Sequence, residues 1–446
     1  MVNEALFRPL VFRNLTVKNR LFRSSISGRI DNYDGSGTPA RIAWEDRFAR
    51  GGVGAIISAH VPVHVRGRIL PNYATIDFDE RIPFWRLVTE RVHASDCKFI
   101  LQLSHSGHQQ DVGGVENEGL LALSSTNQRD FFHGFPTRAM TIPEIQEVVG
   151  QFAAGARRAR AAGCDGIELH ACNGYLFTQF LSSAINDRRD QYGGSLENRA
   201  RFLLDVVRAV RKEVGDDFHL QVKMNGVDHN DAIEPWLPEG NTIEDSIQIA
   251  QWLEKEKVDG LHISTGSYFP HPRNPRGQFP VPTLTGNYDT MISSGSHTLR
   301  NYLAFRYFPT LSTYVWQRTV KGLEPEAVGL DQARAIKASV KIPVLSTGGY
   351  QHASVIREAI ESGSCDGVTM ARTLMANPDL PKMFAQGLEK APKPCSYCNK
   401  CLMNVIENPL GCYDEERFDN DREAMIKDVM SFYGESGFTP APQEPR

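Results

Sequence analysis

Short runs of apolar and β-branched residues recur along the chain, and segments with helical patterns separate them. Strands that alternate with helices in this way predict a parallel sheet. Eight such units predict a closed (β/α)8 barrel of the α/β class, because eight exceeds the usual count of the alternative, an open doubly wound sheet. The eight expected strands are Leu21–Ser24, Val53–Ser58, Phe99–Leu103, Gly166–Leu169, Leu220–Met224, Gly260–Ser264, Pro343–Ser346 and Gly367–Met370.

The helix expected before the fourth strand has clear start and stop signals. Thr141-Ile-Pro-Glu144 has the form of a capping box, with a proline inside the first turn. Apolar residues then follow at helical spacing, and Gly163 provides a stop signal. This segment therefore predicts a helix from about residue 141 to residue 163.

The composition excludes several classes of protein. Of 446 residues, 41% are hydrophobic and 23% are charged, which is the balance of a soluble globular protein. The formal net charge of −4 favours neither nucleic acid nor an anionic membrane as a partner. No apolar run approaches the ~20 residues of a membrane span, and the N-terminus lacks the pattern of a signal peptide. We therefore expect a cytoplasmic protein with no nucleic-acid or membrane partner, and its sequence leaves open whether it forms a homo-oligomer.

Two long connections follow expected strands. Residues 104–138 follow the third strand, and residues 265 to about 320 follow the sixth. Loops of this length in a compact domain are usually lids or binding walls. Because both leave the carboxyl ends of strands, we expect them to form long loops over the C-terminal face of the barrel. We expect the barrel to occupy residues 1–392, and residues 393–446 to form a short C-terminal extension with clustered cysteines and a charged tail.

The fourth strand is followed at once by groups that can hydrogen-bond or transfer a proton. The run Gly166–Leu169 ends in His170, and Asn173 and Tyr175 come next. Parallel α/β folds carry their chemistry at the carboxyl ends of strands. Each residue alone could be structural, but their joint placement favours a functional site.

Other polar residues are expected around the same barrel mouth. The seventh strand is followed by Gly348 and Gly349, and the eighth by Ala371 and Arg372. Loops after strands seven and eight often bind phosphate, since glycine lets backbone N–H groups approach it and arginine binds it through two donors. A cation, an amide and hydroxyls complete the set: Lys223, Gln102, Ser24, Ser25 and Ser27. Together these groups suit a phosphorylated heterocyclic cofactor.

The order of motifs carries a family resemblance. The motifs are Asn19-Arg20, Gln102-Leu-Ser-His, His170-x-x-Asn173-Gly-Tyr175-Leu, Gln179-Phe-Leu and Asn186-x-Arg188-x-Asp190-x-Tyr192-Gly-Gly-Ser-Leu-Glu-Asn-Arg-x-Arg-Phe. This order resembles the old yellow enzyme family of FMN-dependent NADH:flavin oxidoreductases. The resemblance continues through Gly348-Gly349, Ala371-Arg372 and Asn377-Pro378-Asp379-Leu380, and it covers about residues 5–390.

The resemblance implies a function and a role for each residue. Family members take hydride from NAD(P)H onto FMN and pass it to the C=C bond of an α,β-unsaturated carbonyl compound. The resemblance places His170 and Asn173 on the substrate carbonyl oxygen and makes Tyr175 the proton donor. It places the FMN phosphate and ring on these positions: Gly348, Gly349, Ala371, Arg372, Gln102, Ser25, Ser27 and Lys223. Ser27 departs from the threonine or cysteine common in the family, which puts the tuning of the flavin potential in doubt.

The eight cysteines form two sets. Cys97, Cys164, Cys172 and Cys365 stand beside apolar runs and are expected in the core. The other set has the spacing Cys395-x2-Cys398-x2-Cys401-x10-Cys412, which suits tetrahedral zinc or an iron–sulfur cluster. It resembles the branch of the family that includes trimethylamine dehydrogenase and 2,4-dienoyl-CoA reductase, which implies a [4Fe–4S] cluster. Zinc and unligated thiols remain alternatives, since the ten-residue gap is shorter than in that branch.

Three functions remain open at this point. The first is reduction of C=C bonds with NAD(P)H. The second is a flavin and iron–sulfur dehydrogenase or demethylase that passes electrons to a partner protein. Relatives in that branch carry C-terminal nucleotide-binding domains and this chain ends before them, so we expect its electron donor to be NAD(P)H or an external partner. The third is a flavin-free barrel that acts as a binding module. The presence of His170, Asn173 and Tyr175 together argues against this third function.

Overall fold

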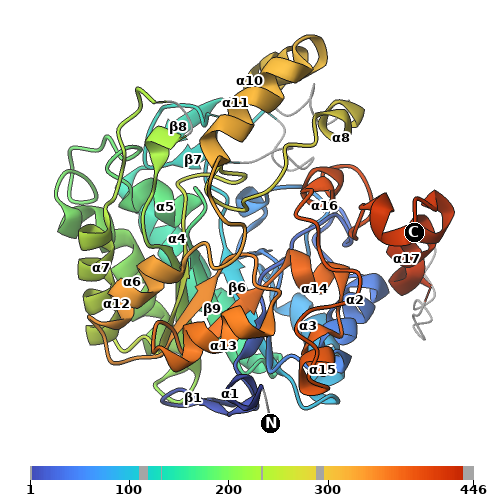
Figure 1. The fold of residues 1–446 in the computed structure, drawn as a ribbon. Coiled ribbons are helices and arrows are strands. Elements are labelled where there is room, and N and C mark those ends of the chain that lie inside the picture. The colour runs from blue at the N-terminus through green and yellow to red at the C-terminus, as the bar shows by residue number, and fades with distance from the viewer. Residues whose placement is uncertain (1–2, 110–118, 132, 233–234, 288–295, 435–446) are drawn as a thin grey trace, which may run out of the picture.

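The computed structural model describes residues 3–109, 119–131, 133–232, 235–287 and 296–434. Their centre is a closed barrel of parallel strands, as predicted (Figure 1). The barrel closes because β4 pairs with both β3 and β6. Its strands are β3 (Leu21–Arg23), β4 (Ala55–Ile57), β6 (Lys98–Ser104), β9 (Gly166–Ala171), β10 (His219–Asn225), β11 (Gly260–Ser264), β12 (Val344–Thr347) and β13 (Gly367–Met370). A short strand, β5 (Val61–Pro62), extends the sheet beyond β6.

Helices surround the barrel and separate its strands along the chain (Figure 1). Helix α4 begins after Thr141, where the predicted capping box is present in both directions, and Gly163 follows its end in the left-handed region. The helices are α2 (Pro39–Arg50), α3 (Ile82–His93), α4 (Ile142–Ala161), α6 (Leu196–Val214), α7 (Ile243–Lys255), α12 (Leu330–Lys337), α13 (Ala353–Glu361), α14 (Arg372–Ala376) and α15 (Leu380–Ala385).

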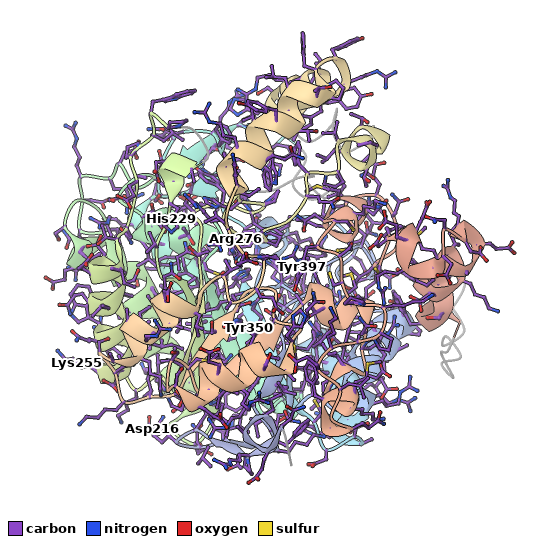
Figure 2. All side chains as sticks on the ribbon, viewed as in Figure 1. Asp216, His229, Lys255, Arg276, Tyr350 and Tyr397 are labelled. Atoms are coloured by element: carbon purple, nitrogen blue, oxygen red, sulfur yellow. The ribbon has the colours of Figure 1, made fainter. Side chains whose placement is uncertain are left out.

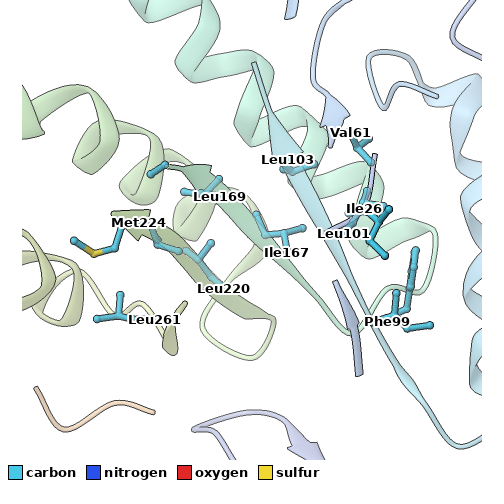
Figure 3. Close-up of a cluster of buried hydrophobic side chains, with 14 of the residues drawn as sticks. Ile26, Val61, Phe99, Leu101, Leu103, Ile167, Leu169, Leu220, Met224 and Leu261 are labelled. Atoms are coloured by element: carbon cyan, nitrogen blue, oxygen red, sulfur yellow. The ribbon is translucent and has the colours of Figure 1, made fainter. Parts of the chain in front are cut away.

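The main core lies between the strands and the surrounding helices. Alternate strand residues such as Leu101, Ile167 and Leu220 belong to this core (Figure 3). Side chains of successive strand residues point to opposite faces. The intervening residues of β6, β9 and β10 therefore face the barrel interior, and several of them are polar.

A second, smaller core closes the amino-terminal end of the barrel. The hairpin of β1 (Leu10–Val11) and β2 (Thr16–Val17) supplies Phe12 and Val17 to it, and the barrel strands supply Phe22, Ile57 and Ile100. Because this end is filled with apolar side chains, the chemistry belongs to the opposite, carboxyl end.

The two long connections leave the carboxyl ends of β6 and β11, and they touch each other. The first contains β7 (Ala122–Ser124) and β8 (Thr137–Ala139), and residues 110–118 within it lie outside the described part. The second contains α8 (Val281–Gly286), α10 (Ser296–Tyr307) and α11 (Pro309–Val320), a helical content that we did not predict. Gln109 of the first connection donates a hydrogen bond to the Phe269 carbonyl of the second over 3.1 Å.

The segment after residue 392 packs onto the barrel. It contains α16 (Lys400–Asn404) and α17 (Arg422–Met430). Phe432 is buried against Trp44 of α2, with ring centroids 4.9 Å apart, and Arg29 donates a hydrogen bond to the Ile406 carbonyl. In the described part of the chain, no helix combines the length and apolarity needed to cross a membrane.

Candidate functional site

The end of β9 brings the three expected catalytic residues together. His170 lies on the strand, and Asn173 and Gly174 then take positive φ angles of 60° and 82°. This turn places Tyr175 just before α5 (Leu176–Leu181), with its ring centroid 4.7 Å from that of His170. A side chain at position 174 would clash, because a Cβ atom there would lie 2.5 Å from the Ser267 carbonyl oxygen. The compact turn therefore depends on glycine.

The His170 imidazole is buried and incompletely bonded. Its Nδ1 lies 3.3 Å from the Ser104 hydroxyl, while Nε2 finds no hydrogen-bond partner among the described residues. Burial, and then the positive charge of Lys223, hold the pKa of His170 well below its usual 6.5, while the nearby Asn173 side chain opposes the shift. A neutral imidazole with an unsatisfied buried nitrogen is a group prepared for a ligand.

His60 is a fourth member of this cluster, and our sequence analysis missed it. It follows β4, and its ring centroid lies 5.2 Å from that of Tyr175 and 5.8 Å from that of His170. Its Nε2 bonds to the Gly67 carbonyl, and burial lowers its pKa to about 4. The sequence feature that could have indicated His60 is its position shortly after an expected strand.

Lys223 stands opposite His170 in the pairing of β9 and β10. Its side chain is buried, with 7% of its surface exposed. Its charge acts on Glu168, a carboxylate inside the barrel that we also missed. Burial alone would raise the pKa of Glu168, but His262, Lys223 and hydrogen bonds hold that pKa below its usual value. The barrel interior therefore holds a carboxylate anion. The sequence feature that could have revealed it is a charged residue within the apolar run Gly166–Leu169.

Gln102 and the two serines occupy the adjacent part of the barrel. The Gln102 amide donates to Glu168 over 2.6 Å and accepts from the Ser25 hydroxyl over 2.9 Å. The Ser27 hydroxyl accepts a hydrogen bond from the backbone N–H of His60. Both ends of the amide thus have protein partners, so a contact of Gln102 with a flavin stays a prediction.

The glycine pair after β12 lies close to Arg372. Gly349 has a φ of 72°, and a Cβ atom there would come within 2.0 Å of the Pro325 carbonyl oxygen. Its own carbonyl accepts a hydrogen bond from Tyr397 over 2.6 Å, and the Arg372 guanidinium lies 5.1 Å from the centroid of the Tyr397 ring. The structure therefore brings together the expected phosphate-binding residues, although Arg372 points toward the C-terminal segment.

Arg372 donates its hydrogen bonds to neutral oxygens. Two further arginines, on the connection that follows β11, lie beside it. The Nη1 of Arg372 bonds to the Arg276 carbonyl over 2.7 Å and to the Asn399 side chain over 2.6 Å. The side chains of Arg273 and Arg276 each have a buried Nε without a partner among the described residues. Burial, and then the charge of Arg273, lower the pKa of Arg276. Figure 2 shows Arg276 beside Tyr397, whose carbonyl accepts a hydrogen bond from the Gln278 backbone. We did not predict a role for these arginines. The sequence feature that could have indicated one is the presence of two cations in a proline-rich connection.

The four clustered cysteines line one cavity together with Arg372 and Arg417. Burial raises the pKa of Cys395 to about 11 and that of Cys401 well above 9, while the charge of Arg372 opposes both shifts. Cys412 accepts a hydrogen bond from Arg417 over 3.1 Å. Within the described ranges, no three His, Cys, Asp or Glu side chains are arranged to hold a single metal ion. The other cysteines, Cys97, Cys164, Cys172 and Cys365, are buried and free, as predicted.

Comparison with known proteins decides the family. The family model described as "NADH:flavin oxidoreductase / NADH oxidase family" matches residues 5–300. The chain belongs to this family. This confirms the resemblance to the old yellow enzymes, and the family name points to flavin and a nicotinamide as the reacting cofactors.

Individual relatives are similar over nearly the whole chain. NADH oxidase of Thermoanaerobacter brockii is 30% identical over 417 residues, which cover 90% of this chain and 56% of that protein. Cinnamate reductase of Clostridium sporogenes is 28% identical over 452 residues, covering 96% of this chain and 61% of that protein. The chain thus spans little more than half the length of these relatives.

Two solved structures have the same fold. A complex of 2-naphthoyl-CoA reductase with 2-naphthoyl-CoA superposes with a TM-score of 0.70 at 25% identity, covering 94% of this chain and 58% of that one. Morphinone reductase in complex with tetrahydroNAD superposes with a TM-score of 0.62 at 24% identity, covering 88% and 94%. The second likeness concerns the fold alone.

Proposed function

We propose that this member of the NADH:flavin oxidoreductase family reduces the C=C bond of α,β-unsaturated carbonyl compounds with NAD(P)H, using FMN. The observation that carries the proposal is the cluster at the end of β9, where His170, with its unsatisfied buried Nε2, meets Tyr175 and Asn173. A relative named cinnamate reductase, whose name states the reduction of an unsaturated acid, is among the similar proteins and supports the proposal.

The residues present fit an FMN group. Three features suit an anionic, phosphorylated ligand: the buried cation of Lys223, the close backbone approach at Gly349, and the buried Nε atoms of two arginines that have no hydrogen-bond partner among the described residues. When bound, FMN would supply the transfer of hydride from the nicotinamide to the substrate. The residues that would hold it are Gly348, Gly349, Ala371 and Arg372 at the phosphate, and Ser25, Ser27, Gln102 and Lys223 at the ring.

His170 and Asn173 would bind the carbonyl oxygen of the substrate. A neutral His170 can donate a hydrogen bond through Nε2 when Nδ1 accepts one from the Ser104 hydroxyl. The Asn173 side chain lies 3.5 Å from the Ser264 hydroxyl, a contact weak enough to be exchanged for a ligand. As negative charge develops on the oxygen, each donor contributes about 3 kcal/mol of stabilisation. The double variant His170→Ala/Asn173→Ala should therefore lose affinity for an enone, and unchanged binding would refute this carbonyl site.

Tyr175 would donate the proton to the α-carbon of the substrate. Replacing it by phenylalanine removes the proton and keeps the ring, so Tyr175→Phe should slow reduction of cyclohexenone by about 10²–10⁴-fold. Reduction of the bound flavin by NAD(P)H, followed anaerobically in a stopped-flow instrument, should be unchanged because that step needs no phenol. Tyr192→Phe is a matched control, since its hydroxyl contacts Gln146 and Asp205 between helices. Enone reduction within twofold of wild type in Tyr175→Phe would refute this role.

A second candidate is a flavin and iron–sulfur dehydrogenase or demethylase that passes electrons to a partner protein. The supporting observation is the cavity lined by Cys395, Cys398, Cys401 and Cys412 beside Arg372. Four cysteine thiols around one cavity are a ligand set that suits a [4Fe–4S] cluster, with zinc as the alternative. A relative named N,N-dimethylglycine/sarcosine dehydrogenase, from Chromohalobacter salexigens, is 29% identical.

Metal analysis after anaerobic purification tests this cluster. We expect iron and acid-labile sulfide at about four of each per chain, and their loss in Cys398→Ser but not in Cys164→Ser, a buried cysteine of the core. Zinc in place of iron, or no metal, would refute the cluster. Anaerobic assays with cyclohexenone and NADPH, and with dimethylglycine and an acceptor dye, then separate reduction from oxidation.

A further inference from the structure

Helices α10 and α11 form a hairpin (residues 296–321) that projects from the body of the molecule (Figure 1). Large apolar side chains are exposed along both helices and at the turn between them. Tyr307 and Phe308, at the turn, are 69% and 62% exposed. The others, between 42% and 59% exposed, are Leu299, Leu303, Leu311, Tyr314 and Val315. An exposed apolar cluster of this size marks an interaction site.

The hairpin is held on the barrel by a different set of side chains. Trp316 stacks on Phe279, with ring centroids 4.9 Å apart, and its indole N–H donates to the Gly277 carbonyl over 3.0 Å. Phe305 packs on the same Phe279 at 5.2 Å. His297 bonds to the Asp130 carbonyl of the other long connection. The inner side is therefore anchored, and the exposed apolar side chains are not needed for that anchoring.

The charge of the hairpin differs from that of the whole chain. The chain has 53 acidic residues among 446, yet residues 296–321 contain none. The same stretch contains Arg300, Arg306, Arg318 and Lys321. Although the net charge of the whole chain is −4, the charged residues of this segment, apart from histidine, are all cations.

We propose that the 296–321 hairpin docks the protein onto an anionic lipid surface. Segments that lie in the membrane interface combine apolar and aromatic side chains with lysine and arginine, as this hairpin does. The most exposed apolar residues lie at its projecting turn, where they can enter the lipid headgroup region. This proposal revises our expectation of no membrane partner, which rested on the charge of the whole chain.

A second copy of the chain is a poorer occupant for this surface. A symmetric dimer through the hairpin would bring two cationic segments together, with no acidic residue in either hairpin to pair with their cations. Because the hairpin belongs to the connection that leaves β11, docking would hold the carboxyl end of the barrel near the lipid surface.

Vesicle co-sedimentation tests the proposal. The full chain is mixed with vesicles of 70% phosphatidylcholine and 30% phosphatidylglycerol, or of phosphatidylcholine alone. We expect binding to the anionic vesicles that weakens when NaCl is raised from 50 to 500 mM. Tyr307→Ser/Phe308→Ser should weaken binding by about tenfold or more, and Arg306→Gln/Arg318→Gln by about fivefold for each charge removed. Trp236→Ser, which removes an equally exposed aromatic residue elsewhere, should bind like wild type.

Two results would overturn the proposal. One is binding to anionic vesicles that is absent, or that is the same in wild type and in Tyr307→Ser/Phe308→Ser. The other is a dimer that becomes a monomer in that variant, by light scattering, while neither protein binds vesicles, which would assign the surface to a second copy. Circular dichroism of each variant checks that a loss of binding is not a loss of folding.

Discussion

The histidines around the barrel mouth are kept neutral by burial. Burial lowers the pKa of His60 to about 4 and that of His105 to about 3, and it holds the pKa of His170 well below 6.5. At physiological pH these rings therefore act as neutral hydrogen-bonding groups. A neutral donor next to Lys223 suits a site in which negative charge develops on the ligand during the reaction.

The same shifts make the stability of the protein depend on pH. Each of these histidines has a lower pKa in the folded state than in the unfolded state, so the unfolded state binds more protons between about pH 6.5 and the folded pKa. Stability should fall as the pH drops through that window, by about 2 kcal/mol per histidine between pH 7 and pH 5. Urea denaturation of wild type and His105→Asn at both pH values measures this loss of stability. Asparagine is chosen because its side-chain oxygen can replace His105 Nδ1 as the acceptor for the Gly107 N–H. An equal loss in both proteins would contradict this cause.

Gly349 is a position where the backbone favours glycine. A Cβ atom there meets the Pro325 carbonyl oxygen at 2.0 Å, and the φ of 72° disfavours any other residue. We expect Gly349→Ala to displace the loop and to weaken FMN binding by more than about tenfold, measured by flavin fluorescence. Gly363→Ala is the matched control, because Gly363 has the same φ of 72° and nothing within 4 Å of its Cβ position. Equal flavin affinity in both variants would show that the cradle is not close to the ligand.

At the scale of elements, α4 shows how a local signal starts a helix. The Thr141 hydroxyl accepts from the Glu144 N–H, and the Glu144 carboxylate accepts from the Thr141 N–H. The same carboxylate pairs with Arg138, a hydrogen bond that lowers the pKa of Glu144 to about 2. These bonds satisfy backbone donors that the first turn of a helix leaves open.

Removing the cap should cost stability without touching the site. We expect Thr141→Ala to lower the free energy of unfolding by about 1 kcal/mol, measured by urea denaturation. Thr141→Ser should keep most of that stability, because serine retains the hydroxyl acceptor. Kinetic constants for an enone should stay at wild-type values in both variants, and a change in them would mean that α4 influences the barrel mouth.

At the scale of the whole molecule, the C-terminal segment is joined to the expected phosphate site. Tyr397 donates to the Gly349 carbonyl, and Asn399 accepts from Arg372. Farther along, Arg417 bonds to both the Ala376 carbonyl and Cys412. Arg372 lines the cysteine cavity and lies over Tyr397, which bonds to Gly349, so we expect a change at the cavity to affect the glycine turn.

Tyr397→Phe isolates this connection. The variant loses one partly buried hydrogen bond to Gly349 and keeps the ring beneath Arg372, so we expect FMN affinity to fall by about five- to tenfold. Iron content, if the cluster is present, should stay unchanged, because Tyr397 contributes only its backbone N–H to Cys395. Titration of the apoprotein with FMN gives the affinity. Wild-type affinity would show that the segment is only a neighbour of the site.

The sequence by itself determined the barrel and the cluster after β9. Strand runs such as Gly166–Leu169, the cap at Thr141 and the spacing of His170, Asn173 and Tyr175 are local, because hydrophobic pattern, capping and turn chemistry act over a few residues. The eight strands lie where those patterns predicted them, with ends that differ by a few residues.

Only the tertiary structure decided which distant residues meet. Glu168 bonds to His262, 94 residues away, and Arg372 bonds to Asn399, 27 residues away, and nothing in the neighbouring sequence indicates either partner. The same holds for the hairpin of α10 and α11, whose apolar residues could equally have been core. Burial depends on what packs against a side chain, and that is settled by the folded chain as a whole.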